Sequence, residues 1–280
     1  MKLLDGRKVA NHILSQLQKE VDRFPTKPKL NVILIGNEPA SISYVHQKAK
    51  ACEQIGVIYE QINYSNKISE ESLFKKIHAI NKDKSVNGLI VQLPIPKHID
   101  TNKIIFEIDH HKDVDGFHPF NLGKIFVGLS SLAPCTPLGI IRLLEYYKIN
   151  LTGKNIVVVG KSNIVGKPMV TLLLNRKATV TSCDAHTKNL KEHTRKADIV
   201  ISATGVAHLI NASYIKKGAV LIDVGFSFRN GKVFGDIDPK SVQKKASYLS
   251  PVPGGVGPMT VALLLENTVK AYKMQHGLLS

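Results

Sequence analysis

The sequence predicts an α/β protein of two domains, each built around a parallel β-sheet. Two observations lead to this class. Short runs rich in valine and isoleucine alternate with longer segments of helical periodicity, and they do so both before and after a loop-rich passage at residues 109–137. The chain has 280 residues, 43% hydrophobic and 21% charged, which suits two ordinary globular domains. No apolar run approaches the roughly 18 residues of a membrane span.

The first half of the chain begins with a helix and continues in β-α-β-α-β order. Apolar residues recur at helical spacing from Asp5 to Phe24, and Pro25 ends the pattern. The elements that follow are a strand at 30–36, a helix from Pro39 to a glycine stop at Gly56, strands at 57–62 and 88–93, and a helix at 69–81 between these strands. Because strands joined through helices pair in parallel, these elements predict the first sheet.

The second half is organised around a strand, a glycine turn and a helix. Ile156 to Val159 form an apolar run too short for a helix, as expected of a strand buried on both faces. Gly160 can then make a tight turn, and Gly166 lets the next helix pack closely. The resulting G-x-S-x-x-x-G pattern is a looser relative of the dinucleotide fingerprint, in which helical N–H groups attract phosphate. On its own the pattern could also be only a strand-to-helix turn.

Three further strands favour a nucleotide-binding sheet. They are expected at 178–183, 198–202 and 219–225, where β-branched residues lead into small residues or glycine. Asp184 follows the first of them and stands 24 residues after Gly160. This is near the spacing at which an acidic residue meets the ribose of a bound dinucleotide.

The expected domain boundaries follow from these patterns. Residues 141–260 would form a Rossmann-like NAD(P)-binding domain, and residues 1–140 a second α/β domain that the C-terminal helix at 261–280 joins. A helix at 138–147 would bridge the two domains, with a cleft between them. The N-terminus has no apolar signal core, so we expect a cytoplasmic protein.

The excess of basic side chains has more than one interpretation. Lysine and arginine number 38 against 22 acidic residues, a formal charge of +16, and a nucleic-acid partner is one explanation. The lysines are scattered, however, without an arginine-rich block or an aromatic stripe for stacking bases. This favours an ordinary solvated surface and no nucleic-acid partner, although a basic surface could also attract small anions.

No metal is expected from the cysteines or histidines. The three cysteines are odd in number and far apart, which indicates neither a disulfide framework nor a zinc site, and we expect buried apolar residues (Cys52, Cys135 and Cys183). The histidines near residue 110 lack helical metal spacing, and we interpret them as loop residues (His110, His111 and His118).

Several polar residues in the first half stand where chemistry is possible. Tyr44 and Lys48 are four residues apart on one helix face, although most such pairs are a half-buried tyrosine and a solvated lysine. Gln92 interrupts an apolar strand near its carboxyl end, either as a satisfied buried amide or as a site group. Asp113 and Asp115 flank a glycine turn without the spaced ligands of a calcium loop, and an Asx turn would explain one of them.

Taken together, these stretches resemble the methylenetetrahydrofolate dehydrogenase/methenyltetrahydrofolate cyclohydrolase family in its bacterial two-activity form. Six motifs carry the resemblance over nearly the whole chain: Tyr44–Lys48, Val91–Pro94, Asp113–Phe117, Pro134–Pro137, Gly160–Pro168 and Pro251–Thr260. The resemblance implies oxidation of 5,10-methylenetetrahydrofolate with a nicotinamide cofactor, followed by hydrolysis to 10-formyltetrahydrofolate in the same cleft. It also implies a homodimer paired through the dinucleotide domains.

The resemblance also assigns roles in the folate site. Lys48 matches the catalytic lysine, which is suited to shuttle protons beside a cationic substrate. Gln92 would orient this lysine, and Tyr44 would lie against the aminobenzoate ring. Asp115 would take two donors of the pterin as a paired hydrogen bond. The wall of the folate slot would come from Pro253, Gly254 and Gly255.

The cofactor site implied by the resemblance departs from the family pattern at two places. Three residues of the turn would hold the cofactor phosphates and ribose, namely Gly160, Lys161 and Ser162. Phe226 would lie near the cofactor where the family more often has isoleucine. After the second strand the family often has His-Ser or a basic residue, but this chain has Asp184-Ala185. The family implies NADP, whereas Asp184 would repel a 2′-phosphate, so we expect appreciable use of NAD.

Other classes of function remain alternatives. A member of the family could have only one of the two activities, and a nucleotide-binding regulator could have kept the sheet but lost the chemistry. Loss of Lys48 or Asp115 would mark such a regulator, and both residues are present.

Overall fold

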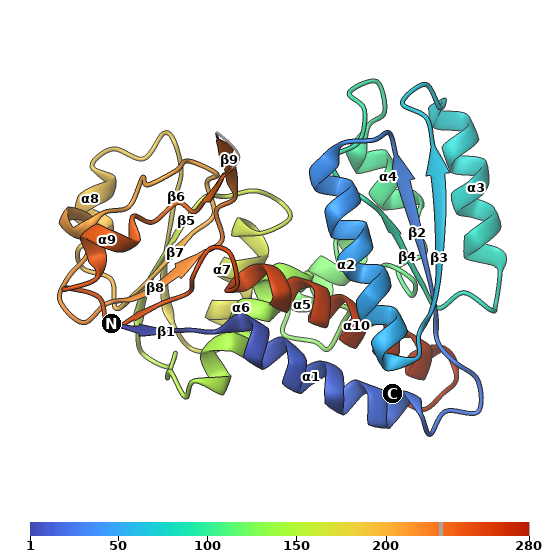
Figure 1. Cartoon of the computed structure of the whole chain (residues 1–280), viewed down its shortest axis with the longest axis horizontal. Helices are drawn as coiled ribbons and strands as arrows, with labels where there is room; N and C mark the ends of the chain where they lie inside the picture. The colour runs from blue at the N-terminus through green and yellow to red at the C-terminus, as the bar shows by residue number, and fades with distance from the viewer. Residues whose placement is uncertain (230–231, 280) are drawn as a thin grey trace. The chain divides into compact units, whose positions relative to one another are not determined.

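The computed structural model describes residues 1–229 and 232–279, and the chain divides into two compact units (Figure 1). Asn11–Cys135 and Val261–Ser280 form the unit that we call three-stranded, and Met1–Ala10 and Thr136–Thr260 form the unit that we call six-stranded. Each unit contains its own parallel sheet. The two-domain α/β class predicted from the sequence is confirmed.

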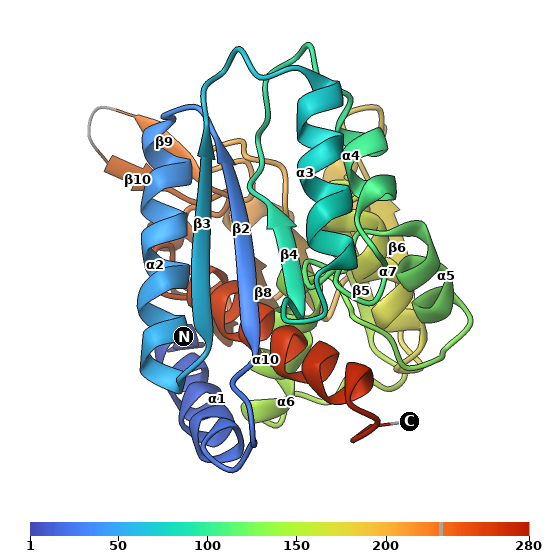
Figure 2. The same cartoon turned by 90° about the vertical axis from the view of Figure 1, so that its right-hand side faces the viewer.

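The sheet of the three-stranded unit has the order β3-β2-β4, with parallel neighbours. Its strands are β2 (Lys29–Ile35), β3 (Ile58–Tyr64) and β4 (Gly88–Val91), and its crossover helices are α2 (Pro39–Ile55) and α3 (Glu70–Lys82). The chain passes from the central strand to one neighbour through α2 and then to the other through α3, so these helices cover opposite faces of the sheet (Figure 2). The predicted elements are confirmed to within a few residues.

Apolar alternation and helix caps explain why these residues form this unit. Ile33 on β2 packs with Leu73 and Ile77 of α3 in one core cluster, and all three side chains are fully buried. Helix α3 begins after Ser69, whose hydroxyl accepts a backbone N–H of the first turn at 3.2 Å. Helix α2 ends at Gly56, which has the left-handed φ of 75° that the predicted glycine stop requires.

The sequence patterns miss two short helices of this unit. They are α4 (Thr101–Glu107) and α5 (Pro119–Phe126), and α5 lies inside the passage expected to be loop-rich. Asp100 caps α4 by accepting a backbone N–H at 2.8 Å, and Nδ1 of His118 caps α5 at 3.1 Å. Helices of seven and eight residues have too few turns to show an apolar stripe, so their caps and prolines are the stronger signals.

Three helices contribute residues to both units. They are α1 (Gly6–Val21), α6 (Cys135–Tyr146) and α10 (Val256–Gln275). Helix α10 begins five residues before the predicted start at residue 261. Gly257 and Pro258 suggested a loop, but proline is tolerated in the first helical turn because its missing N–H has no partner there.

The six-stranded unit contains a parallel sheet with the order β1-β11-β8-β7-β5-β6. The four predicted strands are β5 (Asn155–Val159), β6 (Thr179–Cys183), β7 (Ile199–Ser202) and β8 (Val220–Asp223). The sheet is extended by β1 (Lys2–Leu3) and β11 (Tyr248–Leu249), which have two residues each and therefore no detectable periodicity. The other elements are α7 (Gly166–Leu174), α8 (Leu190–Thr194), η1 (Ala212–Tyr214), α9 (Pro239–Val242) and the antiparallel pair of β9 (Ser227–Arg229) and β10 (Lys232–Phe234).

The turn after β5 requires glycine at both positions that the sequence pattern singled out. Gly160 has a φ of 108°, and a side chain there would place its Cβ 2.3 Å from the carbonyl oxygen of Ala203. A Cβ on Gly166 would lie 2.1 Å from the carbonyl oxygen of Gly160. The close packing of strand and helix predicted from these glycines is therefore confirmed.

The structure also bears on the cysteines and on membrane-spanning helices. The side chains of Cys52, Cys135 and Cys183 are buried and unpaired with one another, as expected of small apolar residues. Within residues 1–229 and 232–279, no helix has the length and apolar character needed to cross a membrane.

Asn267 on α10 ties together two distant segments of the three-stranded unit. Its buried amide donates to the carbonyl oxygens of Val114 and Ala133, at 2.8 Å in each case. A buried carbonyl that loses its donor leaves a desolvated acceptor without a partner, which is costly. Asn267 therefore fixes the loop that carries Asp113 and Asp115.

We predict that Asn267→Ala lowers the free energy of unfolding by on the order of 2–3 kcal/mol, because two buried acceptors lose their donor. Chemical denaturation of the full chain measures this change. Asn102→Ala on the exposed face of α4 is the matched control and should alter stability by less than about 0.5 kcal/mol. Equal stability of the two variants would show that water replaces the Asn267 amide.

Candidate functional site

Lys48 and Gln92 form a hydrogen-bonded pair in the three-stranded unit. Lys48 lies in the middle of α2 with only 6% of its surface exposed, and its Nζ donates to Oε1 of Gln92 at 2.8 Å. Gln92 directly follows β4, and its Nε2 donates to the carbonyl oxygen of Leu93 at 2.7 Å. The amide of Gln92 is therefore held with its oxygen toward Lys48, and the hydrogen bond between them fixes the direction of the ammonium group.

Asp113 is the structural carboxylate of the loop between α4 and α5. It is buried and accepts the backbone N–H groups of Gly116, Phe117 and His118 at 3.1, 3.2 and 2.8 Å. Nδ2 of Asn121 donates to it at 2.9 Å. Burial raises the pKa of Asp113, and these donors limit the rise. The backbone donors lie three to five residues further along the chain, so Asp113 holds its own loop, but not through the bond to the second residue on that defines an Asx turn.

Asp115 lies on the same loop and, like Asp113, lines a pocket. The pocket is small and largely apolar, and its lining includes Asp115, Val91, Leu93 and Phe117. Asp115 is partly exposed, yet the surrounding protein excludes enough water to raise its pKa, while the charge of Lys48 acts in the opposite direction. The structure therefore brings Asp115, Lys48 and Gln92 into one electrostatic neighbourhood.

Tyr44 and Cys135 complete the surroundings of this group. Tyr44 lies one turn before Lys48 on α2, is partly exposed, and has a pKa that burial raises. Cys135 is buried, and its Sγ donates to the carbonyl oxygen of Val114 at 3.3 Å. Burial, together with the nearby Asp115 carboxylate, holds the pKa of Cys135 well above its usual value, so this thiol is not a nucleophile.

The loop of Pro253, Gly254 and Gly255 belongs to the six-stranded unit. The carbonyl oxygen of Gly254 accepts the backbone N–H groups of Gly6 and Arg7 at 3.0 and 3.3 Å, so the loop caps the start of α1. A Cβ on Gly255 would lie 2.5 Å from a backbone oxygen, and only glycine fits. The loop is thus fixed by its backbone and carries few side-chain atoms.

The turn at Gly160 presents hydroxyl and charged groups at the carboxyl end of β5. Ser162 follows Gly160 by two residues, and its Oγ accepts the backbone N–H groups of Val165 and Gly166 at 3.1 and 3.4 Å. These two donors at the start of α7, expected to face an anion, are therefore already satisfied within the turn.

Lys161 forms an ion pair with Asp184, which directly follows β6. Asp184 also accepts the backbone N–H of His186 at 3.0 Å. The hydrogen bond from Lys161, followed by that from His186, lowers the pKa of Asp184. Ala185 is exposed, and Phe226 after β8 is 47% exposed. The structure thus brings Lys161 and Asp184 together at the end of the sheet.

A buried carboxylate network at the ends of β7 and β8 was missed by the sequence analysis. Oδ2 of Asp236 accepts the hydroxyls of Ser202 and Thr204 at 2.9 and 2.8 Å and the backbone N–H of Thr204 at 2.7 Å. Asp223 accepts the backbone N–H groups of Gly225, Asp236 and Ile237 at 2.9–3.0 Å. Burial, opposed by these donors, raises the pKa of Asp223 to about 7.

The sequence contains only a weak indication of this network. Gly225 and Gly235 stand beside the two aspartates, and a Cβ on either would lie 2.0 Å from a carboxylate oxygen. A polar strand end next to such a glycine can indicate a close backbone approach. The network fixes two loops at the carboxyl edge of a parallel sheet, where ligands of such sheets bind.

Comparisons with known proteins identify two domains in the chain. Residues 4–115 match the sequence model of the tetrahydrofolate dehydrogenase/cyclohydrolase catalytic domain, and residues 134–276 match that of the tetrahydrofolate dehydrogenase/cyclohydrolase NAD(P)-binding domain. The second match covers the Gly160 turn, Asp184 and the carboxylate network. The predicted Rossmann-like NAD(P)-binding domain is therefore confirmed.

Individual relatives match along nearly the whole chain. The bifunctional protein FolD of Nautilia profundicola is 50% identical over 277 residues, which are 98% of both chains. The crystal structure of the bifunctional methylenetetrahydrofolate dehydrogenase/cyclohydrolase FolD of Campylobacter jejuni is 46% identical, with a TM-score of 0.95, and the match covers 98% of this chain and 99% of that one. The Trypanosoma brucei methylenetetrahydrofolate dehydrogenase-cyclohydrolase, solved with NADP cofactor and inhibitor, is 34% identical, with a TM-score of 0.92 over 96% of both chains. The chain belongs to the tetrahydrofolate dehydrogenase/cyclohydrolase family.

Proposed function

We propose that this chain is a bifunctional enzyme of one-carbon metabolism. It oxidises 5,10-methylenetetrahydrofolate to 5,10-methenyltetrahydrofolate and then hydrolyses the product to 10-formyltetrahydrofolate. The observation that carries this proposal is the buried Lys48, which is held by Gln92 and whose charge acts on Asp115. A nucleotide-binding regulator would have no need to bury a lysine beside a carboxylate, which costs free energy.

In the dehydrogenase step the protein mainly positions its substrate. Bound NAD(P) supplies the hydride acceptor, and the folate supplies a methylene carbon between two nitrogens, which stabilise the cation that remains. Asp115 would hold the pterin through two parallel hydrogen bonds, and Tyr44 would support the aminobenzoate ring. Accurate positioning of this kind supplies much of the rate enhancement in reactions between two bound molecules.

In the cyclohydrolase step Lys48 would handle protons. Water adds to the methenyl carbon and loses one proton. As the bond from this carbon to N5 breaks, the remaining hydroxyl loses its proton to form the formyl C=O and N5 takes up one proton, so that one proton is released overall. Lys48 would move the proton between water and nitrogen, as a positioned acid–base group does. The bond from Lys48 to Gln92 would keep the ammonium aimed at the reacting atoms.

The ionised form of Asp115 is suited to bind the pterin. Burial raises the pKa of Asp115, so holding the ionised carboxylate in a site without substrate costs free energy. Two N–H donors of a pterin would satisfy both carboxylate oxygens and stabilise the charge. Binding energy would thus come from a group that is poorly solvated before the substrate arrives.

The cofactor preference is proposed to be mixed, with NADP bound and NAD used appreciably. Gly160, Lys161 and Ser162 would hold the phosphates and ribose, with Phe226 beside the cofactor. Asp184 would accept a hydrogen bond from the 2′-hydroxyl of NAD and repel the 2′-phosphate of NADP. Its ion pair with Lys161 supports a mixed outcome, because the lysine partly neutralises this repulsion.

We further propose a cytoplasmic homodimer that pairs through the NAD(P)-binding domains, as the family resemblance implies. The outer strand β6 supports this proposal, since three of its five residues are exposed. An edge strand of this kind is able to pair with a second copy. Sedimentation of the purified chain measures the oligomeric state.

We predict that Lys48→Met lowers cyclohydrolase activity by about 10²–10⁴-fold, the usual contribution of an acid–base group, and largely preserves folate binding. Hydrolysis of methenyltetrahydrofolate is followed by absorbance, and folate affinity by titration. Lys50→Met, an exposed lysine on the same helix, serves as the control and should retain full activity. Cyclohydrolase activity within about tenfold of the parent would remove Lys48 from the mechanism.

We predict that Asp115→Ala weakens folate binding by roughly 2–5 kcal/mol, because the pterin donors lose a charged partner, and leaves dinucleotide affinity unchanged. Calorimetric titration with each ligand separates the two effects. Asp22→Ala removes an exposed carboxylate of the same unit and should change neither affinity. Unaltered folate affinity in Asp115→Ala would show that another group binds the pterin donors.

We predict that Asp184→Ser raises the ratio of kcat/KM for NADP to that for NAD by about tenfold or more, because the substitution removes a like-charge repulsion of the 2′-phosphate. The substitution also frees Lys161 to pair with the 2′-phosphate. Lys161→Ala is the complementary variant and should lower the same ratio. A parent preference for NADP above a hundredfold that Asp184→Ser does not change would place Asp184 away from the ribose.

A further inference from the structure

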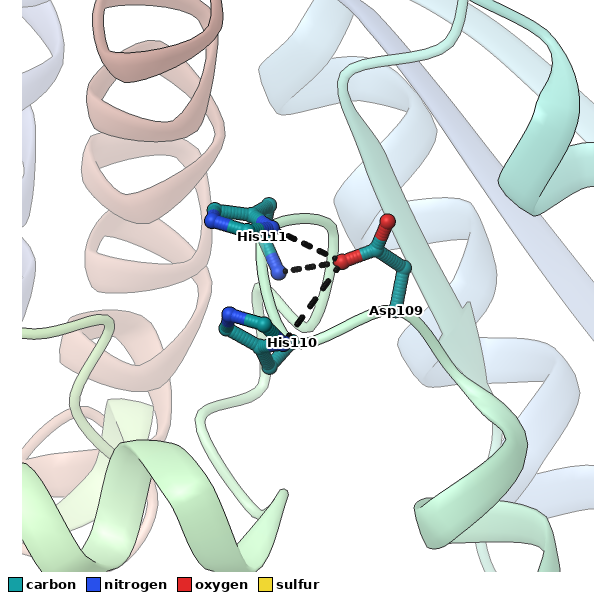
Figure 3. Close-up of side chains that lie close together, drawn as sticks. All are labelled: Asp109, His110 and His111. Atoms are coloured by element: carbon teal, nitrogen blue, oxygen red, sulfur yellow. Dashed lines mark hydrogen bonds and ion pairs between the residues drawn. The ribbon is translucent and has the colours of Figure 1, made fainter.

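Asp109, His110 and His111 gather one carboxylate and two imidazoles around a common point (Figure 3). Nδ1 of His111 lies 3.0 Å and Nδ1 of His110 lies 3.8 Å from Oδ1 of Asp109, and one ligand atom from each residue lies within 4.8 Å of the others. Ligand atoms that share a zinc ion are roughly 3–3.5 Å apart, since each is about 2.0–2.1 Å from the metal. We propose that these three residues, called the DHH cluster, bind a divalent transition metal ion of the zinc type.

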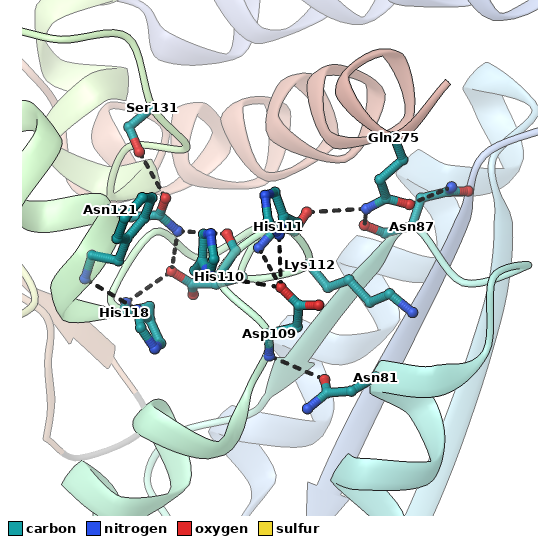
Figure 4. Close-up of polar contacts among 12 residues, drawn as sticks. Asn81, Asn87, Asp109, His110, His111, Lys112, His118, Asn121, Ser131 and Gln275 are labelled. Atoms are coloured by element: carbon teal, nitrogen blue, oxygen red, sulfur yellow. Dashed lines mark hydrogen bonds and ion pairs between the residues drawn. The ribbon is translucent and has the colours of Figure 1, made fainter. Parts of the chain in front are cut away.

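The backbone of the DHH cluster is held in place by three amide side chains from three helices (Figure 4). Each amide makes one hydrogen bond to the backbone of one cluster residue. The bonds are Asp109 N–H to Asn81 Oδ1 at 3.0 Å, Asn121 Nδ2 to the His110 carbonyl at 2.9 Å and Gln275 Nε2 to the His111 carbonyl at 3.0 Å. These amides lie on α3, α5 and α10, so the ligand side chains start from fixed backbone positions, as a metal site requires.

The side chains of the cluster are of the kinds that bind such a metal. A neutral imidazole and an ionised carboxylate are the forms that coordinate a metal ion, and ordinary histidine and aspartate side chains are mostly in these forms at neutral pH.

Neighbouring cations limit the affinity without blocking the site. Lys124 and His118 both act electrostatically on His110, and Lys112 acts on Asp109. The Lys112 ammonium is directed to two backbone carbonyls, of Ile80 at 2.8 Å and Asp83 at 2.6 Å. The side chains of the cluster remain open to solvent, with 54% of His111 and 36% of Asp109 exposed. We therefore expect a reversible site of moderate affinity, with water completing the coordination.

The donor set favours a particular class of metal. Two imidazole nitrogens and one carboxylate oxygen suit zinc, nickel, cobalt or copper, whereas magnesium and calcium prefer oxygen ligands throughout. A bound ion would join three consecutive residues directly before the loop of Asp113 and Asp115. Metal occupancy would thereby stabilise the loop that carries the proposed pterin ligand.

Titration of the full-length, tag-free chain with Zn²⁺ at neutral pH tests the proposal. We expect calorimetry to show one zinc ion per chain. His110→Asn and His111→Asn should each weaken zinc binding by about tenfold or more, since losing a ligand should cost more affinity than losing a residue that hydrogen-bonds to a ligand. His193→Gln removes an exposed histidine of α8 and should leave zinc binding unchanged. Affinity should fall at acidic pH, because protons compete for the imidazoles.

Imidazole NMR signals of the unsubstituted chain provide a measurement that does not depend on the folding of a variant. Signals of His110 and His111 should shift on zinc addition, and that of His193 should not. Binding that survives both substitutions, or imidazole signals of the cluster that do not move, would overturn the proposal. Equal competition by Mg²⁺ would also overturn it, because the donor set predicts a preference for zinc.

Discussion

The three-stranded unit depends on the burial of one carboxylate, that of Asp113. Four donors surround it, three from the backbone of its own loop and one from Asn121. The same Asn121 amide also donates to the His110 carbonyl and accepts from Ser131 at 2.7 Å, so one polar network holds several turns. Removing any member would leave buried polar atoms without partners, and both Asp115 and the DHH cluster would lose their fixed positions.

The six-stranded unit uses the same device at the carboxyl edge of its sheet. Asp223 and Asp236 are buried at the carboxyl ends of parallel strands, and their bonds go mostly to backbone N–H groups of the adjoining loops. A loop at such an edge cannot use strand hydrogen bonds, because the sheet has ended. Carboxylates that accept several N–H groups replace them, and the neighbouring glycines allow the close approach.

The sequence predicted the regular elements well and the polar networks poorly. Long strands and helices such as α2 and β5 follow from local periodicity, whereas the pairing of Gln92 with Lys48 followed from the family resemblance. The contact of Asn267 with Val114 spans 153 residues and leaves no local pattern. The histidines of residues 110 and 111 were judged by helical spacing, but a turn brought their ring nitrogens together. Short elements such as β1 and α4 depend on neighbours or caps instead of a stripe.

The basic charge of the chain also has a structural explanation that composition alone could not reveal. Several lysines donate to carbonyl oxygens at or near helix ends, where a positive charge complements the helix dipole. Lys27 donates to the last residue of α1, Val21, at 2.8 Å, and Lys112 to carbonyls at the end of α3 at 2.8 and 2.6 Å. Because these ammonium groups satisfy backbone carbonyls, part of the excess of +16 is explained by the fold itself.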